Sequence, residues 1–184
     1  MFELSSQLPD IFKYNEIIKE RYGLHVFKPR NKKDLARCGV DMFHVINQAF
    51  APLYEFTKLS EAQIKSYVSQ YVSVMNKHLI CMLQNSKDEI VGFAVTVPSL
   101  SKAFRKCKGR LFPFGFIPVL HALKHNDTLE ALMIGVRPEY QGKGANVLIF
   151  KHIHENALKF GIKRIVLNPQ LEHNSKVQNL FGVY

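Results

Sequence analysis

One stretch in the C-terminal half constrains the fold more than any other part of the sequence. The apolar run Leu129–Val136 favours a strand and ends just before a turn at Pro138. Glycine at Gly142 opens a tight loop, and the amphipathic run Gly144–Phe160 then favours a helix. A second apolar run, Ile162–Leu167, favours another strand. The sequence therefore predicts a strand, a glycine-rich loop, a helix and a second strand in that order.

The remaining periodic segments place helices and a hairpin before this stretch. Predicted helices cover Leu8–Tyr22, Asp34–Phe50 with an interruption near Gly39, Ser60 to about Asn76, and the start of one at Asn174–Phe181. Predicted strands cover His25–Pro29, His78–Gln84 and Glu89–Val97, the last two joined by a polar turn. The order predicts an α/β fold in which helices flank a mixed sheet.

Composition limits the class of protein. A chain of 184 residues with 47% hydrophobic residues can bury the core of one domain. No apolar run is long enough to span a membrane and the N-terminus is not a signal peptide, so we expect a cytoplasmic protein without a stable membrane span. Cys38, Cys81 and Cys107 form no C-x-x-C pair, which favours packing or surface roles in a reducing compartment.

The formal charge of +10 suits several anionic partners, including nucleic acid, acidic lipid and the phosphates of a nucleotide cofactor. The lysines and arginines are spread along the chain, which favours a solvated basic surface over a nucleic-acid site. His121 and His125 have a spacing that suits zinc, but no third ligand is apparent, so we expect no metal.

The glycine-rich loop has the features of a phosphate site. Free N–H groups at the start of a helix point outward and carry the positive end of the helix dipole. Gly142 and Gly144 lack the Cβ atoms that would keep a phosphate from the backbone, and Lys143 adds a positive charge. A simple tight turn is the alternative interpretation.

This loop resembles the acetyl-CoA-binding motif of GNAT acyltransferases, in which Gln or Arg is followed after two residues by Gly, any residue, and Gly or Ala. Gln141, Gly144 and Asn146 occupy these positions, and Asn146 departs from the pattern. The resemblance extends in element order over about residues 25–181. It implies an acyl-CoA co-substrate, with its pantetheine in a V-shaped opening between strands 129–136 and 162–167. The implied cofactor-binding residues are Ile134, Gly135, Val136, Gln141, Gly142, Lys143, Gly144, Ala145 and Asn146.

The resemblance also suggests catalytic candidates. Glu130 is the candidate base, since period-two alternation predicts that it shares a face with Ile134 and Val136. A solvent-facing glutamate at a strand end is the alternative. The family's tyrosine acid would fall on Phe181, which cannot donate a proton, and Tyr184 is the candidate substitute.

We therefore expect an N-acyltransferase that moves an acetyl or longer acyl group from CoA, by direct attack, to a primary amine of a small molecule, a lipid precursor or a protein, with a small-molecule amine as the expected partner. The alternatives are a non-catalytic acyl-CoA-binding or interaction module and a nucleic-acid-binding protein. We expect residues 1–23 to connect to a GNAT-like domain at 24–184, which stops short of the family's last strands. A second domain, such as the other copy of a tandem protein, or a homodimer would then cover the sheet edge.

An insertion at residues 98–128 is rich in phenylalanine and too rich in proline for one continuous helix. It has two possible roles: a lid over the acceptor or acyl chain, or a patch that meets a membrane or a partner. We favour the lid, because family order places the insertion near the acceptor cleft.

Overall fold

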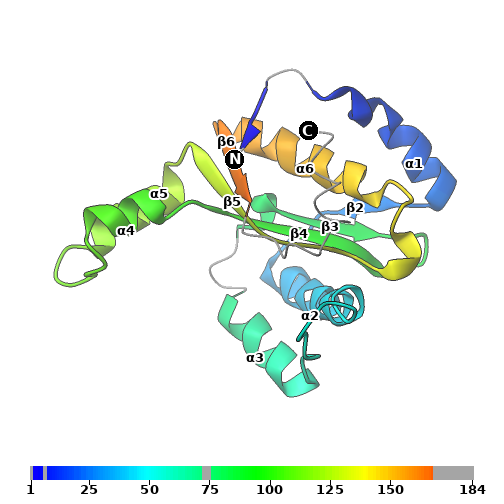
Figure 1. The fold of residues 1–184 in the computed structure, drawn as a ribbon, viewed down its shortest axis with the longest axis horizontal. Coiled ribbons are helices and arrows are strands. Elements are labelled where there is room, and N and C mark those ends of the chain that lie inside the picture. Colours follow the sequence, from blue (N-terminus) through cyan, green and yellow to red (C-terminus); the bar gives the residue numbers. More distant parts are fainter. Residues whose placement is uncertain (1, 6–7, 72–75, 168–184) are drawn as a thin grey trace.

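The computed structural model describes residues 2–5, 8–71 and 76–167, and these form one mixed sheet covered by helices on both faces (Figure 1). The strands are β1 (Phe2–Glu3), β2 (His25–Phe27), β3 (Ile80–Gln84), β4 (Ile90–Pro98), β5 (Thr128–Val136) and β6 (Arg164–Leu167). They lie in the order β1-β6-β5-β4-β3-β2. All neighbouring pairs are antiparallel except β5 and β6, which are parallel. The predicted α/β fold with a mixed sheet is confirmed.

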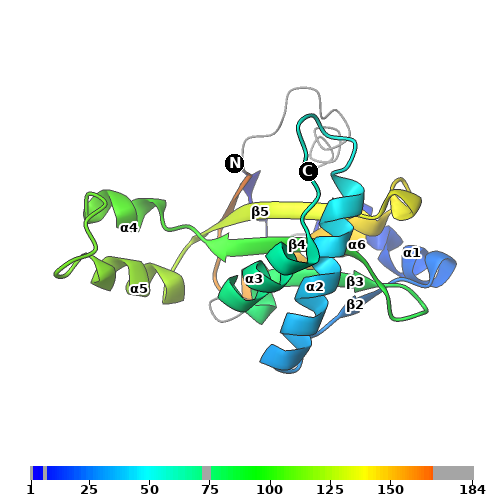
Figure 2. The same cartoon turned by 90° about the horizontal axis from the view of Figure 1, so that it is seen from below.

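The helices form two layers and a projecting arm. They are α1 (Asn15–Tyr22), α2 (Lys32–Ala49), α3 (Glu61–Tyr71), α4 (Ser101–Lys106), α5 (Phe116–Lys124) and α6 (Ala145–Lys159), with 3-10 turns η1 (Asp10–Tyr14), η2 (Lys77–Leu79) and η3 (Pro138–Tyr140). Helices α2 and α3 cover one face of the sheet, and α1 and α6 cover the other (Figure 1). Helices α4 and α5 project from the side of the sheet where β4 ends and β5 begins (Figures 1 and 2).

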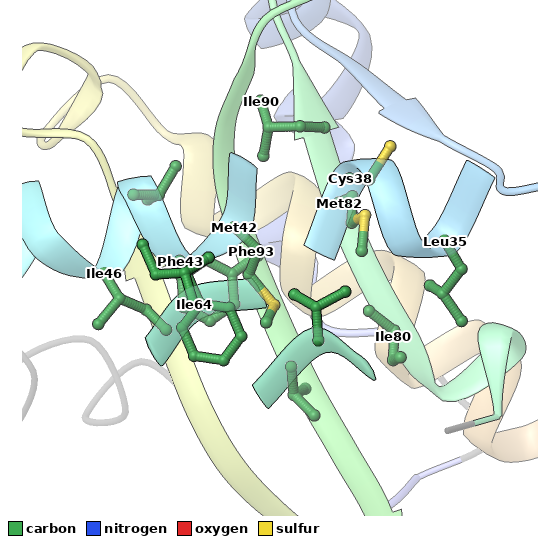
Figure 3. Packing of buried hydrophobic residues seen from close by; sticks show 13 residues of the cluster. Leu35, Cys38, Met42, Phe43, Ile46, Ile64, Ile80, Met82, Ile90 and Phe93 are labelled. Carbon is green, nitrogen blue, oxygen red and sulfur yellow. The ribbon is translucent and has the colours of Figure 1, made fainter. Parts of the chain in front are cut away.

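The core beneath α2 and α3 explains why these segments are helical. Asn31 caps α2 by accepting a hydrogen bond from the Asp34 N–H at 2.9 Å, and Ser60 and Gln63 bond reciprocally at the start of α3. Apolar residues at helical spacing then face β3 and β4, where Phe43, Ile64 and Phe93 meet in one cluster (Figure 3).

Several predicted boundaries need correction. Helix α2 is not interrupted at Gly39, because this position lies against Val68 of α3 and the missing Cβ allows close packing. The first predicted helix begins at Asp10 as the 3-10 turn η1, and residues 77–79 before β3 form η2. The two-residue strand β1 was not predicted. The region 98–128 contains two short helices, as its prolines indicated. The predicted helix at 174–181 lies outside the described residues.

The N-terminal residues contact the rest of the sheet. Phe2 and Glu3 pair with Ile165 and Arg164, and α1 packs on α6. In the described part of the chain, β1 is therefore the strand that covers the outer edge of β6. The division of the chain at residue 23 stays a prediction.

Asp127 ties the start of β5 to the start of β6. Its carbonyl accepts the N–H groups of Lys163 and Arg164, and its carboxylate bonds to Thr128, Lys102 and Arg164. The hydrogen bond from Thr128 has the largest influence on the pKa; burial opposes it, and the hydrogen bonds from Lys102 and Arg164 act in the same direction as that of Thr128. Together they lower the pKa of Asp127 from its ordinary 3.8 to about 2.

We predict that the titration of the Asp127 carboxylate makes the protein less stable in acid. Because the folded pKa is lowered, the ionised carboxylate contributes fully above the unfolded value near 3.8, and the contribution is lost as the pH falls toward about 2. Asp127→Asn removes the titration, so its melting temperature should fall relative to wild type at neutral pH and the difference should shrink between pH ~4 and ~2. Thermal denaturation across this range tests the prediction, and a difference independent of pH would contradict it.

Candidate active site at the end of β5 and the start of α6

A β-bulge lies in the middle of β5. Val95 of β4 pairs with Met133, but Thr96 pairs with Ala131, which leaves Leu132 as the extra residue on β5. A bulge shifts the side-chain alternation of its strand by one position. Met133 accordingly packs with the core under α2 and α3, whereas Ile134 packs with the cluster under α6.

In the described part of the chain, strands β5 and β6 are paired side by side at the start of both strands. The register runs from Thr128 opposite Arg164 to Ala131 opposite Leu167. Strand β5 then continues to Val136, while the described part of β6 ends at Leu167. The expected V-shaped opening would begin at this point, and its other side falls on residues outside the described part. The opening itself stays a prediction.

The predicted face of Glu130 is wrong because of the bulge. Leu129 packs with Ala157 of α6, so its neighbour Glu130 points to the opposite face of the sheet, the side covered by α2 and α3. Ile134 and Val136 pack on the α6 side. Strict alternation along β5 predicts that Glu130, Ile134 and Val136 lie on one face. It does not anticipate the bulge at Leu132, because the bulge depends on the pairing of β5 with β4.

Two serines hold the carboxylate of Glu130. Its Oε1 accepts hydrogen bonds from Ser99 Oγ at 2.5 Å and from Ser101 Oγ at 3.0 Å. Asn126 donates to the Ser99 carbonyl at 2.6 Å and so fixes this corner. Glu130 pairs with Val166 of β6, one residue before the last pair in the described part of the chain. Sequence reasoning missed both serines, and only the register of β4 on β5 would have found them.

The loop before α6 is built by glycines in left-handed conformations. Gly142 has φ = 72° and Gly144, the residue that caps α6, has φ = 79°. A Cβ at Gly142 would meet nothing within 4 Å, so the loop is open to a ligand there. A Cβ at Gly144 would lie 2.7 Å from Ile18 Cδ1 of α1, so this glycine also allows α1 to approach.

Four amides of this loop are available to an anion. Among the described residues, the N–H groups of Gly142, Gly144, Ala145 and Asn146 have no hydrogen-bond acceptor, and no side chain caps α6. Ala145 is buried at 1% exposure in the cluster under α6, whereas Asn146 is half-buried. These N–H groups lie at the positive end of the α6 dipole, as the sequence predicted for a phosphate site.

Other predicted loop residues brace the turn. The side chain of Gln141 donates from Nε2 to the Val136 carbonyl at 3.0 Å, and its own N–H donates to Pro138. Lys143 Nζ lies 5.8 Å and 5.5 Å from the ring centroids of Tyr22 and Tyr140. The cation is thus held beside the loop, where it adds positive potential.

Gly135 has a packing role that the sequence did not reveal. A Cβ at this position would lie 2.6 Å from the Phe93 ring, so the glycine lets β5 pass close to the core. Arg137 Nε, one turn before the loop, is buried and has no hydrogen-bond partner within the described residues. An unpaired buried donor in the segment between β5 and the open amides fits a site that receives an anionic group from outside the chain.

The other candidates named from the sequence add no further described group to this site. Tyr184 lies outside the described residues, so its role as acid stays a prediction. Cys38 and Cys81 are buried, and burial raises the pKa of both thiols, which keeps them neutral. Within the described ranges no cluster of three or more His, Cys, Asp or Glu residues suits a metal ion. No helix in the part described is long and apolar enough to cross a membrane.

Comparison with known proteins identifies the family. The model of the acetyltransferase (GNAT) family matches residues 42–182, which is most of the chain. This protein therefore belongs to the GNAT acetyltransferase family. Its enzyme class is that of the N-acetyltransferases.

Solved acetyltransferases share the fold at low sequence identity. An aminoglycoside acetyltransferase from an uncultured soil sample, solved with sisomicin, superposes with a TM-score of 0.56 at 8% identity over 90% of this chain and 89% of that one. A Salmonella typhimurium protein, assigned as an acetyltransferase and solved with its cofactor acetyl-CoA, gives 0.53 at 16% identity over 86% and 76%. These identities support the fold and not the acceptor.

One curated relative is similar over part of its length. It is named a bacterial ceramide synthase, from Caulobacter vibrioides, and is 24% identical over 142 residues. The match covers 74% of this chain and 37% of the relative. The chain thus spans little more than a third of that protein.

Proposed function

We propose that this chain transfers an acyl group from acyl-CoA to a primary amine by direct attack. The observation that carries the proposal is the pair of features at the two ends of β5. Open amides at the start of α6 suit the diphosphate of CoA, and a carboxylate held by two serines lies toward the other end of β5, in the stretch that pairs with β6. The diphosphate and the base are thereby separated along one strand, as a long pantetheine arm requires.

The cofactor-binding residues are proposed on this geometry. Gly142, Gly144, Ala145 and Asn146 would donate N–H groups to the diphosphate, and Lys143 would add charge. Gln141 acts by bracing the turn. The three strand residues Ile134, Gly135 and Val136 would line the path of the pantetheine.

Glu130 is proposed as the general base. The amine nitrogen forms a bond to the thioester carbonyl carbon, the carbon–sulfur bond breaks, and the amine proton passes to the Glu130 carboxylate. Because Glu130 faces the α2 and α3 side, we infer that the amine approaches from that face while the diphosphate lies by α6. Ser99 and Ser101 orient the carboxylate, and the group that protonates the leaving thiolate is water or Tyr184.

We infer that the amine is attached to an apolar chain. The curated relative's name refers to ceramide, an amide of a long-chain amine. The insertion beside Glu130 exposes many apolar side chains, which supports an apolar acceptor or acyl group. We also propose that the protein acts in the cytoplasm, and that a second domain or a second copy adjoins the sheet edge.

Thiol release tests the proposed function. The purified protein is mixed with acetyl-CoA or palmitoyl-CoA and with a panel of amines that includes spermidine, lysine and a long-chain amine. We expect release of CoA thiol in step with amide formation, fastest with the long-chain amine, measured by thiol titration and mass spectrometry. Binding of CoA without thiol release for any amine would instead support a non-catalytic acyl-CoA-binding module.

A further inference from the structure

The insertion forms a projecting arm, residues 99–127, whose two helices α4 and α5 lie side by side (Figures 1 and 2). Helices α4 and α5 contact each other, and Ala103 of α4 is buried. Asn126 joins the arm to its base by donating to the carbonyls of Ser99 and Ala122 at 2.6 Å and 3.1 Å. The arm is thus a built element anchored at the end of β4.

The surface of the arm is unusually apolar. Phe112 and Phe114 at its tip are 87% and 71% exposed. The other exposed apolar residues of the arm are Phe104, Leu111, Phe116, Ile117, Leu120 and Leu123. Helix α5 has no buried residue although most of its side chains are apolar, and an exposed patch of this kind marks an interaction site.

The arm does not act as a lid in this structure. None of its exposed apolar side chains belongs to the clusters that pack against the sheet in the described chain. The helices point away from β4 and β5 instead of lying over them (Figure 2). An apolar surface directed outward needs a partner that is not part of the described chain.

The charges of the arm select the partner. Among residues 99–127 the one acidic residue in the sequence is Asp127 at the base of the arm, where it pairs with Lys102 and Arg164. The basic residues of this stretch are Lys102, Arg105, Lys106, Lys108, Arg110 and Lys124. Aromatic side chains combined with cations are the features by which proteins bind to the interface of an anionic bilayer, since the rings enter the headgroup region and the cations attract acidic lipid.

We propose that the arm docks on an anionic membrane surface, with Phe112 and Phe114 in the lipid interface and the flanking basic residues against the headgroups. The base of the arm carries Ser99 and Ser101, which bond to Glu130. Docking therefore brings the Glu130 end of β5 toward the bilayer. From this position the membrane would supply the amine, an inference that rests on the proposed function. The docking itself does not rest on the proposed function.

Vesicle co-sedimentation tests the docking without any turnover. Wild-type protein is mixed with vesicles of phosphatidylcholine alone or with added phosphatidylglycerol, at low and high salt. We expect binding to the anionic vesicles that weakens with salt, and at least about tenfold weaker partition for Phe112→Ser/Phe114→Ser and for Lys106→Glu/Lys108→Glu. Tyr54→Ser is the matched control, because Tyr54 is 82% exposed and lies outside the arm. It should bind as wild type does.

Three outcomes would overturn the proposal. The first is a wild-type protein that does not sediment with phosphatidylglycerol vesicles. The second is arm variants that sediment as wild type does. The third is that the wild-type protein self-associates in solution, that the arm variants do not, and that the protein does not bind to vesicles. This result would make the arm an interface between copies of the chain. Thiol release with a water-soluble amine is measured in parallel, so that loss of docking and loss of the proposed activity are told apart.

Discussion

Replacing Glu130 by glutamine is expected to slow thiol release by about 100-fold or more while leaving the affinity for CoA unchanged. Glutamine keeps the shape and can still bond to Ser99 and Ser101, but it cannot accept the proton of the attacking amine. The proposed diphosphate site lies at the other end of β5, so the affinity for CoA should not change. Steady-state kinetics and calorimetric titration with CoA measure the two quantities separately.

A matched variant shows whether the effect belongs to this carboxylate. Glu155→Gln makes the same change on α6. Glu155 Oε1 lies 3.9 Å from Lys151 Nζ, and Glu155 is in the third turn of the helix, away from the loop. Its kinetics should match those of wild type. Unchanged turnover in Glu130→Gln would remove Glu130 as the base and return it to the role of a strand-end glutamate held by two serines.

Asn146→Asp is expected to weaken CoA binding by about 100-fold without lowering the stability of the protein. A carboxylate about 5 Å from a phosphate, at an effective dielectric constant of about 20, costs about 3 kcal/mol. The same negative charge in the first turn of α6 interacts favourably with the helix dipole, by about 0.3–1 kcal/mol. Binding and stability should therefore change in opposite directions, which an unfolded variant cannot imitate.

The control for this prediction is a second asparagine at a helix start. Asn31→Asp at the cap of α2 makes the same charge change and keeps the acceptor for the Asp34 N–H. It should leave CoA binding unchanged. Calorimetric titration and thermal denaturation are measured for both variants, and equal CoA affinity in Asn146→Asp and wild type would exclude the α6 start as the diphosphate site.

The elements of the fold that depend on local rules were predictable from the sequence. The apolar run of β5, the glycines at 142 and 144 and the amphipathic pattern of α6 act over a few residues each, so their order was predicted correctly. The capped start of α3 is also local and was predicted, whereas α2 begins at Lys32 after its cap Asn31 and not at Asp34 as predicted. Gly39 misled the prediction because a glycine weakens an isolated helix, whereas here Val68 packs against it.

The parts of the site that depend on pairing between distant segments were not predictable. The bulge at Leu132 arises from the register of β4 on β5, and it moves Glu130 to the other face relative to Ile134. Ser99 lies 31 residues from Glu130 in sequence, so no local pattern joins them. The pair of residues in β1 is too short to show any period, and it is held by its contact with β6.

The decisive experiment is an amide proton–nitrogen correlation spectrum recorded while CoA is added to the isotope-labelled protein. If the diphosphate sits on the first turn of α6, the largest shifts will belong to Gly142, Gly144, Ala145 and Asn146, and desulfo-CoA, which keeps the diphosphate, will reproduce them. If these four signals stay still while others move, CoA binds elsewhere and the account is wrong.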